Sequence, residues 1–477
     1  MAEIKLPTLK GNSSTTTTQK KKILLLSDDL RMHSGIGTMS REFVLGTIHK
    51  YDWVQVGAAI KHPEQGKVIS LDDQVRKETG ISDAKLKIYA NSGYGNPQML
   101  RDLINIENPD AIMHYTDPRF WGWLYQMEHE IRQSIPIMYY TIWDDLPYPR
   151  WNEPFYESCD LLMSISKQTH GIVKNVIRKY PKKDWATTYI PHGINEHHFF
   201  PLEYEDDGFK KFKNKMLNGK EKKFIIFYNN RNIRRKMPGD IILAYKTFCD
   251  KLPKEEADKC CLLMHTHRVD ENGTDLPSVV NEICSEYDVI FSDQKLDRQH
   301  LNWLYNMADV QINIASNEGF GLSGAEALMT GTPIINNITG GLQDHCGFKL
   351  KGEYLTHDDY VEIGSLHDDR KWANTPDLTW GEWAKPVWPS NRALVGSPPT
   401  PYIFDDRCRF DDVAEAMKYW YDIPHEERKR CGILGREFAL REETGFSAKN
   451  MCNRFIKDME ICFEKFEPRK RFNIFKA

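Results

Sequence analysis

The fold of this chain is decided by the stretch Ser316-Asn317-Glu318-Gly319-Phe320-Gly321-Leu322-Ser323-Gly324-Ala325-Glu326-Ala327-Leu328-Met329. The apolar run Val310–Ile314 before it predicts a strand, and Leu322–Met329 predicts a helix. A glycine-rich turn between a strand and a helix presents free backbone N–H groups at a helix N-terminus, which favours a bound phosphate. Glu318 and Glu326 would repel that phosphate, so we expect them to face hydroxyl groups. The alternative is a plain strand–turn–helix with a charged cap.

Short apolar runs alternate with amphipathic stretches on both sides of this segment. This alternation is typical of parallel sheets that carry helices on both faces. The predicted strands are Lys22–Ser27, Trp53–Ala59, Ala111–Tyr115, Ile135–Thr141 and Leu161–Ser164 in a first series, and Phe224–Tyr228, Cys261–His265, Val289–Ser292, Val310–Ile314 and Pro333–Asn336 in a second. We therefore predict an α/β fold with two Rossmann-like, doubly wound domains facing across a cleft, where ligands bind beyond the carboxyl ends of the strands.

Composition and periodicity set the predicted boundaries. These are a polar, disordered leader at 1–20, an N-terminal domain at 21–200, a charged linker at 201–223, a C-terminal domain at 224–445 with an insertion at 346–409, a long helix at 446–470 and a tail at 471–477. The insertion contains Trp372, Trp380, Trp383 and Trp388. A structureless loop of that length is improbable in a compact domain, so we expect it to be ordered. It would shape an acceptor site or a contact surface, or form a small satellite core.

The overall composition excludes several classes of protein. A net charge of -4 argues against a dedicated nucleic-acid binder, although a local basic groove stays open. The chain has no apolar run of about 18 residues, which predicts no membrane-spanning helix, and its start lacks the apolar core of a secretory signal. The ten cysteines are scattered without a CxxC pair. They predict reduced thiols in a cytoplasmic protein.

The glycine-rich stretch resembles the E-x7-E motif of the retaining GT-B glycosyltransferases of the family 4 type. Glu318 and Glu326 have the spacing of that motif, and the surrounding residues match its usual wording. The resemblance implies that Glu318 approaches the hydroxyls of the transferred sugar and that Glu326 binds the ribose of the nucleotide. The backbone N–H groups of Gly321, Leu322 and Ser323 would hold the diphosphate. The aromatic insertion resembles versions in viral and phage sequences.

Two further loops agree with this resemblance. The family has an arginine and a lysine five positions apart after the first strand of its second domain, and Arg231 and Lys236 match. Such cations neutralise the leaving diphosphate, whose charge grows as the glycosidic bond breaks. A solvated basic loop is the alternative, and the neighbouring Arg234 and Arg235 fit either. Gly35 and Gly37 resemble the loop of the first domain that approaches the donor phosphate. The last helix resembles the one that returns to the N-terminal domain.

The acceptor side departs from the family pattern. Trp143 and Asp144 stand where the family often has a histidine, so Asp144 would accept or orient the acceptor's hydroxyl proton, or would only cap local structure. His192 is expected to order the backbone. No Asp-Asp pair has a clear DxD setting, so we predict no metal and no cofactor besides the nucleotide sugar.

The sequence therefore predicts a hexosyl- or pentosyltransferase that uses a nucleotide diphosphate sugar and retains the anomeric configuration. A UDP-sugar is the first expectation, with GDP and ADP forms open. The acceptor hydroxyl belongs to a glycan, a protein or a hydroxymethylated DNA base. Two alternatives on the same fold are a sugar-nucleotide 2-epimerase and a catalytically inactive binding module. The oligomeric state stays open, and the location is expected to be the cytoplasm, of the host if the chain is viral.

Overall fold

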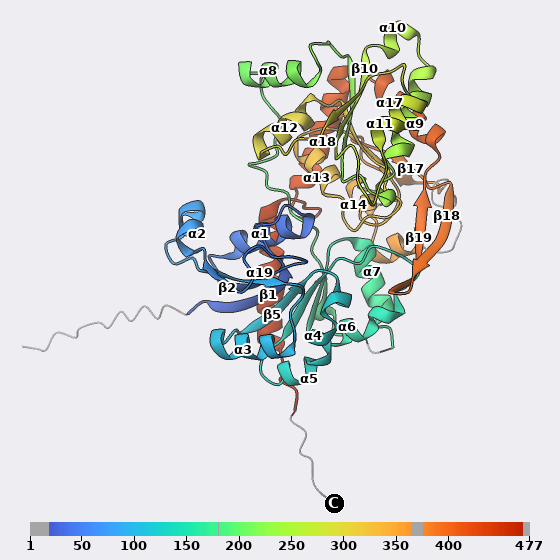
Figure 1. Ribbon diagram of the computed structural model, residues 1–477. Helices are drawn as coiled ribbons and strands as arrows, with labels where there is room; N and C mark the ends of the chain where they lie inside the picture. Colours follow the sequence, from blue (N-terminus) through green and yellow to red (C-terminus); the bar gives the residue numbers. More distant parts are fainter. Residues whose placement is uncertain (1–18, 180, 364–374, 471–477) are drawn as a thin grey trace, which may run out of the picture.

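The computed structural model describes residues 19–179, 181–363 and 375–470. Two lobes lie one above the other, and the chain passes between them before α8 and again at its last helix (Figure 1). Residues 1–18 of the predicted leader, Trp372 of the predicted insertion and the predicted tail at 471–477 lie outside the described residues.

The N-terminal domain is built on a sheet with strand order β3-β4-β2-β1-β5-β6-β7-β8, in which β3 pairs antiparallel and the other pairs are parallel. The strands are β1 (Lys21–Asp28), β2 (Tyr51–Ala59), β3 (Val68–Ser70), β4 (Leu86–Ser92), β5 (Ala111–Tyr115), β6 (Ile137–Thr141), β7 (Leu161–Ser164) and β8 (Thr187–Tyr189). The helices are α1 (Gly35–Thr47), α2 (Asp72–Thr79), α3 (Pro97–Glu107), α4 (Gly122–Gln126), α5 (Glu128–Ile131), α6 (Glu153–Glu157) and α7 (Lys167–Val176), with the 3-10 helices η1 (Pro118–Trp121), η2 (Arg150–Asn152) and η3 (Asp184–Ala186).

The C-terminal domain has a parallel sheet with strand order β11-β10-β9-β12-β13-β17. Its strands are β9 (Phe224–Asn229), β10 (Cys260–His265), β11 (Val289–Ser292), β12 (Val310–Asn313), β13 (Ile334–Asn337) and β17 (Ala384–Val387). Its helices are α8 (Asp207–Met216), η4 (Arg234–Lys236), α9 (Pro238–Asp250), α10 (Lys254–Ala257), α11 (Leu276–Ile283), α12 (Arg298–Met307), α13 (Leu322–Met329), α14 (Leu342–His345), α15 (His357–Ile363), α17 (Phe410–Asp422) and α18 (His425–Leu440). The prediction of two Rossmann-like α/β domains is confirmed.

Continuous apolar runs form the central strands because both faces of each sheet are covered. Ile23, Leu24, Leu25 and Leu26 of β1 are fully buried. Side chains on one face of β1 pack against α1, and those on the other face join the cluster formed with α3 and α4. Burial of each such side chain contributes about 1.5–3 kcal/mol, which makes these runs the strongest strand signals in the sequence.

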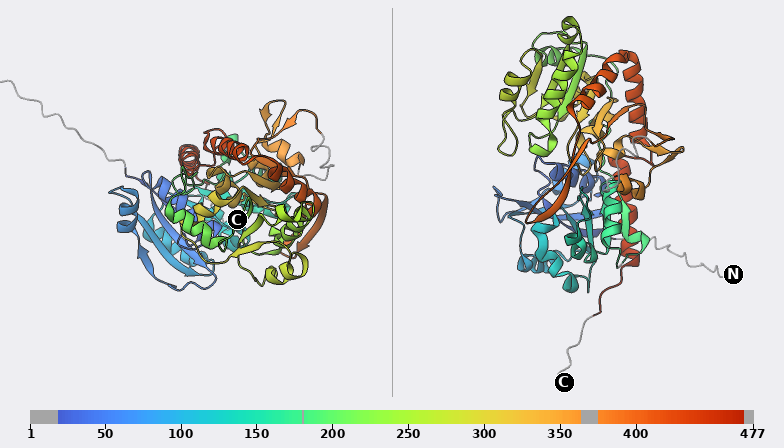
Figure 2. Two further views of the ribbon diagram at one scale, coloured as in Figure 1. Left: turned by 90° about the horizontal axis from the view of Figure 1, so that it is seen from above. Right: turned by 90° about the vertical axis from the view of Figure 1, so that its right-hand side faces the viewer.

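The last helix, α19 (Ala448–Lys465), packs against α1 of the N-terminal domain. The rings of Phe43 and Phe455 lie 5.0 Å apart, and the Tyr51 hydroxyl donates to Glu460 at 2.9 Å. In Figures 1 and 2 this helix runs from the upper lobe down along the lower one. It therefore ties the end of the C-terminal domain to the sheet of the first.

Two segments carry more structure than their patterns indicated. The charged segment 201–223 holds α8, whose Phe209 is buried with its ring 6.0 Å from that of Trp303. The described part of segment 346–409 holds a small sheet, the helix α15, a strand of the main sheet (β17) and a hairpin. The small sheet contains β14 (Lys349–Leu350), β15 (Glu353–Tyr354) and β16 (Leu378–Thr379), and the hairpin contains β18 (Asn391–Ser397) and β19 (Thr400–Arg407). These strands are too short or too exposed to give a clear period.

All ten cysteines lie in the described part of the chain as free, buried thiols. Among the described residues, no helix combines the length and the apolar character needed to cross a bilayer.

Candidate active site

The loop between β12 and α13 brings Glu318 to the carboxyl end of the C-terminal sheet. Glu318 is buried and accepts a hydrogen bond from Lys236 Nζ on η4. Arg235 Nη1 donates to the backbone oxygen of Asn317 at 2.7 Å and lies 3.5 Å from Glu318 Oε2. The structure thus brings the acid Glu318 together with two adjacent cations, Arg235 and Lys236, which lie about 80 positions earlier in the sequence.

Lys236 is buried, and this burial together with the nearby Arg235 lowers its pKa, whereas Asp144 raises it. A buried ammonium keeps its charge only beside an anion. Glu318 supplies that anion here, and a phosphate oxygen placed at the same point would supply it equally well.

Glycines shape the turn that follows Glu318. Gly321 has φ of 89° and stands just before α13, a conformation that L side chains rarely adopt. The backbone of Gly341 donates to Glu318 O at 2.8 Å, and a side chain at the preceding Gly340 would collide with the same oxygen. The second glycine turn therefore fixes the backbone that carries Glu318.

Glu326 lies one turn inside α13, and its hydrogen-bond partners differ from those of Glu318. The Tyr305 hydroxyl donates to Glu326 Oε2 at 2.5 Å, and Asn229 Nδ2 lies 3.5 Å from the same oxygen. Burial raises the pKa of Glu326 to about 7, while the bond from Tyr305 lowers it. The carboxyl is thus separated from the Lys236–Glu318 pair and titrates near neutral pH.

Ser323, also on α13, accepts from Asn230 Nδ2 at 3.4 Å and from Gln311 Nε2 at 3.3 Å. Leu322, at the start of the same helix, is half-buried.

Arg231 lies apart from these groups. Its side chain is 59% exposed, and its Nε donates to Asp270 Oδ2 at 2.8 Å. The structure brings Arg235, rather than Arg231, to Glu318. Both arginines stand in one basic run, Arg231-Asn232-Ile233-Arg234-Arg235-Lys236, and only the short helix η4 decides which of them turns inward.

The glycine loop of the N-terminal domain faces α13 across the interface. A Cβ atom at Gly35 would lie 3.6 Å from Leu322 Cδ1, so the start of α1 approaches the start of α13. Gly37 donates its backbone N–H to Ser34 Oγ at 3.0 Å and leaves no room for a side chain beside Met32 O. The two predicted anion-binding turns therefore meet.

Asp144 also faces the Glu318 loop from the N-terminal domain. A Cβ at Gly319 would lie 3.8 Å from Asp144 Cβ and 2.9 Å from Ile165 Cδ1, so Gly319 permits this approach. The neighbouring Asp145 is buried, and burial together with Asp144 raises its pKa well above the usual range, while Arg235 lowers it. Sequence reasoning did not single out Asp145, because nothing in an Asp-Asp pair shows which member is buried.

Both ring nitrogens of His192 make hydrogen bonds within the N-terminal domain. Its Nδ1 lies 2.8 Å from the Tyr140 hydroxyl and its Nε2 3.3 Å from the Tyr115 hydroxyl. Burial lowers the pKa of His192 to about 3, so the ring is neutral near pH 7. It packs against Phe320, with ring centroids 5.2 Å apart, and thereby supports the Glu318 loop.

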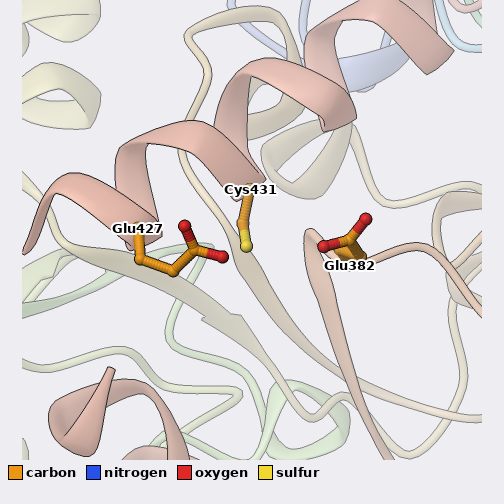
Figure 3. Close-up of side chains that lie close together, drawn as sticks. All are labelled: Glu382, Glu427 and Cys431. Atoms are coloured by element: carbon orange, nitrogen blue, oxygen red, sulfur yellow. The ribbon is translucent and has the colours of Figure 1, made fainter. Parts of the chain in front are cut away.

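Within the part of the chain that the structure describes, one group of potential metal ligands lies on the C-terminal domain, where Glu382, Glu427 and Cys431 have ligand atoms within 4.8 Å of one another (Figure 3). Arg430 forms ion pairs with Glu382 and Glu427, the latter at 2.7 Å. The guanidinium of Arg430 thus joins these carboxylates in an ion-pair network.

Comparisons with known proteins bear on the family and the fold of this chain. Residues 206–383 match the family described as Family 4 Glycosyltransferase in conflict systems. A search of curated proteins finds no match. Among solved structures, the chain is similar to the Anabaena protein HepE in complex with UDP and glucose, with 10% identity, TM-score 0.61, and coverage of 92% of this chain and 100% of that one.

Two further solved structures are similar over nearly their whole length. A glycosyltransferase from Rickettsia africae has 14% identity and TM-score 0.60, covering 94% of this chain and 99% of that one. Sucrose-phosphate synthase from Thermosynechococcus elongatus has 15% identity and TM-score 0.61, covering 93% and 100%. The chain therefore has the GT-B fold, and its residues 206–383 are similar to family 4 glycosyltransferases.

Proposed function

We propose that this protein is a glycosyltransferase that moves a sugar from a nucleotide diphosphate donor to a hydroxyl group of an acceptor. The observation that carries the proposal is the meeting of Lys236, Arg235 and Glu318 at the start of α13, opposite Asp144. Fixed cations beside a helix N-terminus stabilise the charge that develops on a leaving diphosphate. The family match over residues 206–383 supports the same chemistry.

The donor fits this site in one orientation. The diphosphate lies against the backbone N–H groups of Gly321, Leu322 and Ser323, with Lys236 and Arg235 beside it. Glu326, held by Tyr305 and Asn229, accepts hydrogen bonds from the ribose hydroxyls. Glu318 then faces the sugar. Gly35 and Gly37 close the phosphate site from the other domain. A UDP-sugar is the first choice, because HepE was solved with UDP.

The proposed retention of configuration requires the acceptor hydroxyl to approach the anomeric carbon from the face of the sugar that the diphosphate leaves. In the proposed step the acceptor hydroxyl attacks the anomeric carbon while the bond from that carbon to the diphosphate breaks. A diphosphate oxygen on the same face of the sugar would accept the proton of the hydroxyl. Asp144 orients that hydroxyl from the N-terminal domain. The protein's contribution is positioning together with charge stabilisation, for which Lys236 and Arg235 take the part of a metal ion.

The acceptor is a glycan, a protein or a hydroxymethylated DNA base. Because the family description refers to conflict systems, modified DNA and protein should be tested as acceptors alongside a glycan.

The test is to incubate the full chain with UDP-, GDP- and ADP-linked hexoses and pentoses, with a chelator present, and to measure released nucleoside diphosphate. Each donor is assayed alone and with a glycan, a protein extract and hydroxymethylcytosine-containing DNA. We expect nucleotide release from a UDP-sugar in the chelator, and faster release with one acceptor class. Analysis of the product's anomeric configuration checks retention.

Other results separate the alternatives. A 2-epimer of the donor formed without nucleoside diphosphate release would identify an epimerase. Donor binding without turnover against every acceptor would identify a binding module. Activity that disappears in the chelator and returns with magnesium or manganese would overturn the metal-free mechanism.

A further inference from the structure

The hairpin β18–β19 leaves the C-terminal domain and lies against the N-terminal one. Figure 1 shows it at the edge of the molecule, descending from β17 to the level of α6 and α7, and the right-hand view of Figure 2 shows the same crossing. Its strands pair from Asn391 with Arg407 to Ser397 with Thr400. After the hairpin the chain returns to the C-terminal domain as α17.

β19 is anchored to the N-terminal domain by main-chain and side-chain contacts. Phe404 N donates to Leu146 O at 2.7 Å, and the Phe404 side chain is buried within the N-terminal core. The Tyr402 hydroxyl donates to Tyr148 O at 3.1 Å, and its ring packs at 4.6 Å from that of Trp151.

The same strand is anchored to the Glu318 loop two residues further on. Asp406 N donates to Ser316 O at 3.0 Å. Asp406 itself is buried, accepting from Thr339 Oγ1 at 2.8 Å and from Arg392 Nε at 2.5 Å. The backbone oxygen of Asp406 accepts from Asn337 Nδ2 at 2.9 Å.

Phe404 contacts the N-terminal domain and Asp406 contacts the C-terminal domain, so two positions of β19 bridge the two domains beside the site. Two residues of a strand span about 7 Å. Leu146 lies two positions after Asp144, and Ser316 lies two positions before Glu318. β19 thus links the loop that carries the acceptor-side acid to the loop that carries the donor-side acid.

The hairpin tip adds a third contact. Arg119, held by Asp117 at 2.9 Å, donates to Pro399 O at 3.0 Å and to Thr400 Oγ1. Its guanidinium also lies 5.6 Å from the Trp143 ring, next to Asp144. The tip therefore reaches the acceptor side of the interface.

We propose that β18–β19 is an interdomain strap, and that Tyr402, Phe404 and Asp406 are positioning residues that hold the Asp144 loop in register with the Glu318 loop. This inference rests on the proposed glycosyl transfer. When the register is correct, the sugar passes to the acceptor hydroxyl. When the register is lost, the donor site still cleaves the nucleotide sugar, but water replaces the acceptor hydroxyl and the donor is hydrolysed.

The experiment uses the double variant Tyr402→Phe, Asp406→Asn, which keeps the shape of both side chains and weakens their links to the two domains. The control is Leu394→Ala, because Leu394 pairs with Phe404 in the hairpin yet is 65% exposed. Transfer and donor hydrolysis are measured separately, and UDP affinity is measured by calorimetry. A spin label is placed on each domain at Ile60→Cys and Val269→Cys, two exposed positions, to give the interdomain distance distribution.

We expect the ratio of transfer to hydrolysis to fall by roughly 10–100-fold in the double variant, since a misplacement of about 1 Å costs up to about 100-fold. UDP affinity stays at the wild-type value and the interdomain distance distribution broadens. The Leu394→Ala control matches wild type in all readouts. Parallel loss of transfer and hydrolysis, or an unchanged distance distribution, would overturn the strap. If the wild-type chain turns over no nucleotide sugar, the proposed function fails, and the distance distribution alone then decides for or against the strap.

Discussion

Lys236 and Glu318, 82 positions apart in the sequence, form an ion pair in which both side chains are about nine-tenths buried. Breaking such a pair by removing one partner is costly, because the other charge is left without compensation. In the proposed reaction the donor meets this pair already assembled. The donor's phosphate then forms an ion pair with Lys236, and the donor's sugar hydroxyls donate hydrogen bonds to the carboxylate of Glu318.

Replacing Lys236 by methionine removes the buried cation aimed at the leaving diphosphate. We expect turnover to fall about 100–1,000-fold, the usual cost of one such stabilising group. The thermal midpoint also falls, because Glu318 loses its partner. Steady-state kinetics and thermal unfolding measure the two effects.

Two controls separate catalysis from folding in that experiment. Arg234→Ala removes an exposed cation from the same short helix and should leave turnover and thermal midpoint unchanged. The double variant Lys236→Met, Glu318→Gln should regain most of the lost thermal stability without regaining turnover. Near wild-type turnover in Lys236→Met would make Lys236 a structural charge only.

The two arginines of the basic run are expected to act on different kinetic constants. Arg235 contacts the Glu318 loop, so Arg235→Ala should lower kcat by about 10–100-fold through lost charge stabilisation. Arg231 is exposed and paired with Asp270, so it can attract the anionic donor only as a surface charge, and Arg231→Ala should raise KM for the donor with kcat unchanged. A larger loss of kcat in Arg231→Ala would mean that Arg231 leaves Asp270 when the donor binds. Asp270→Asn, measured alongside, would then lower KM.

Glu326 makes nucleotide binding depend on pH. Its pKa in the folded protein is raised from 4.5 to about 7 by burial, so the fold favours the neutral acid. The stability it contributes is therefore complete below about pH 4.5 and is lost as the pH rises through about 7. The ionised carboxylate is the better acceptor for ribose hydroxyls, so we expect UDP affinity to increase between about pH 6 and about pH 8.

The diphosphate itself also gains charge near about pH 6, which is why the comparison needs Glu326→Gln. Calorimetry at several pH values should show a steeper rise for wild type than for this variant. Glu326→Gln should also raise KM more than it lowers kcat, because ribose is bound equally in the ground and transition states. Identical pH slopes for the two proteins would remove Glu326 from the ribose site.

The sequence was sufficient for the two-domain fold because its central strands are continuous apolar runs. Val289–Ser292 and Leu322–Met329 were predicted to the residue. β17 was hidden because its four residues, Ala384–Val387, show no alternation and follow a tryptophan-rich stretch. Phe209 on α8 was missed because the segment has few apolar residues, and two of them, Phe209 and Phe212, pack together on the ring of Trp303.

The sequence predicts which residues form the candidate site, but it does not predict the contacts between them. The family resemblance implied that Arg231 and Lys236 lie at the donor site, yet a motif spacing cannot tell that Arg235 turns inward and Arg231 outward. Their difference lies in the backbone on either side of η4, where Ile233 before the helix is extended and Met237 after it has φ of 52°. The link from Phe404 to Leu146 joins positions that are far apart in the sequence, and no local pattern predicts it.

Trp380 and Trp383 should behave differently when each is replaced by alanine. Trp383 is buried, its Nε1 donates to His345 O at 2.9 Å and its ring lies 4.7 Å from that of Phe438. Its loss should reduce the free energy of unfolding by about 3–5 kcal/mol, the usual cost of an emptied aromatic site. Transfer and donor hydrolysis should fall together, because the Gly347 turn packs on this ring and β17 begins at the next residue.

Trp380 is 40% exposed and lies 6.2 Å from the Phe348 ring, so Trp380→Ala should leave stability and both activities near wild type. This pair of outcomes assigns Trp383 to the main hydrophobic core, gives Trp380 no part in acceptor binding and leaves acceptor positioning to the strap. Thermal unfolding with parallel transfer and hydrolysis assays on both variants provides the measurement. Loss of transfer alone in Trp380→Ala would instead place the acceptor against the small sheet of β14, β15 and β16.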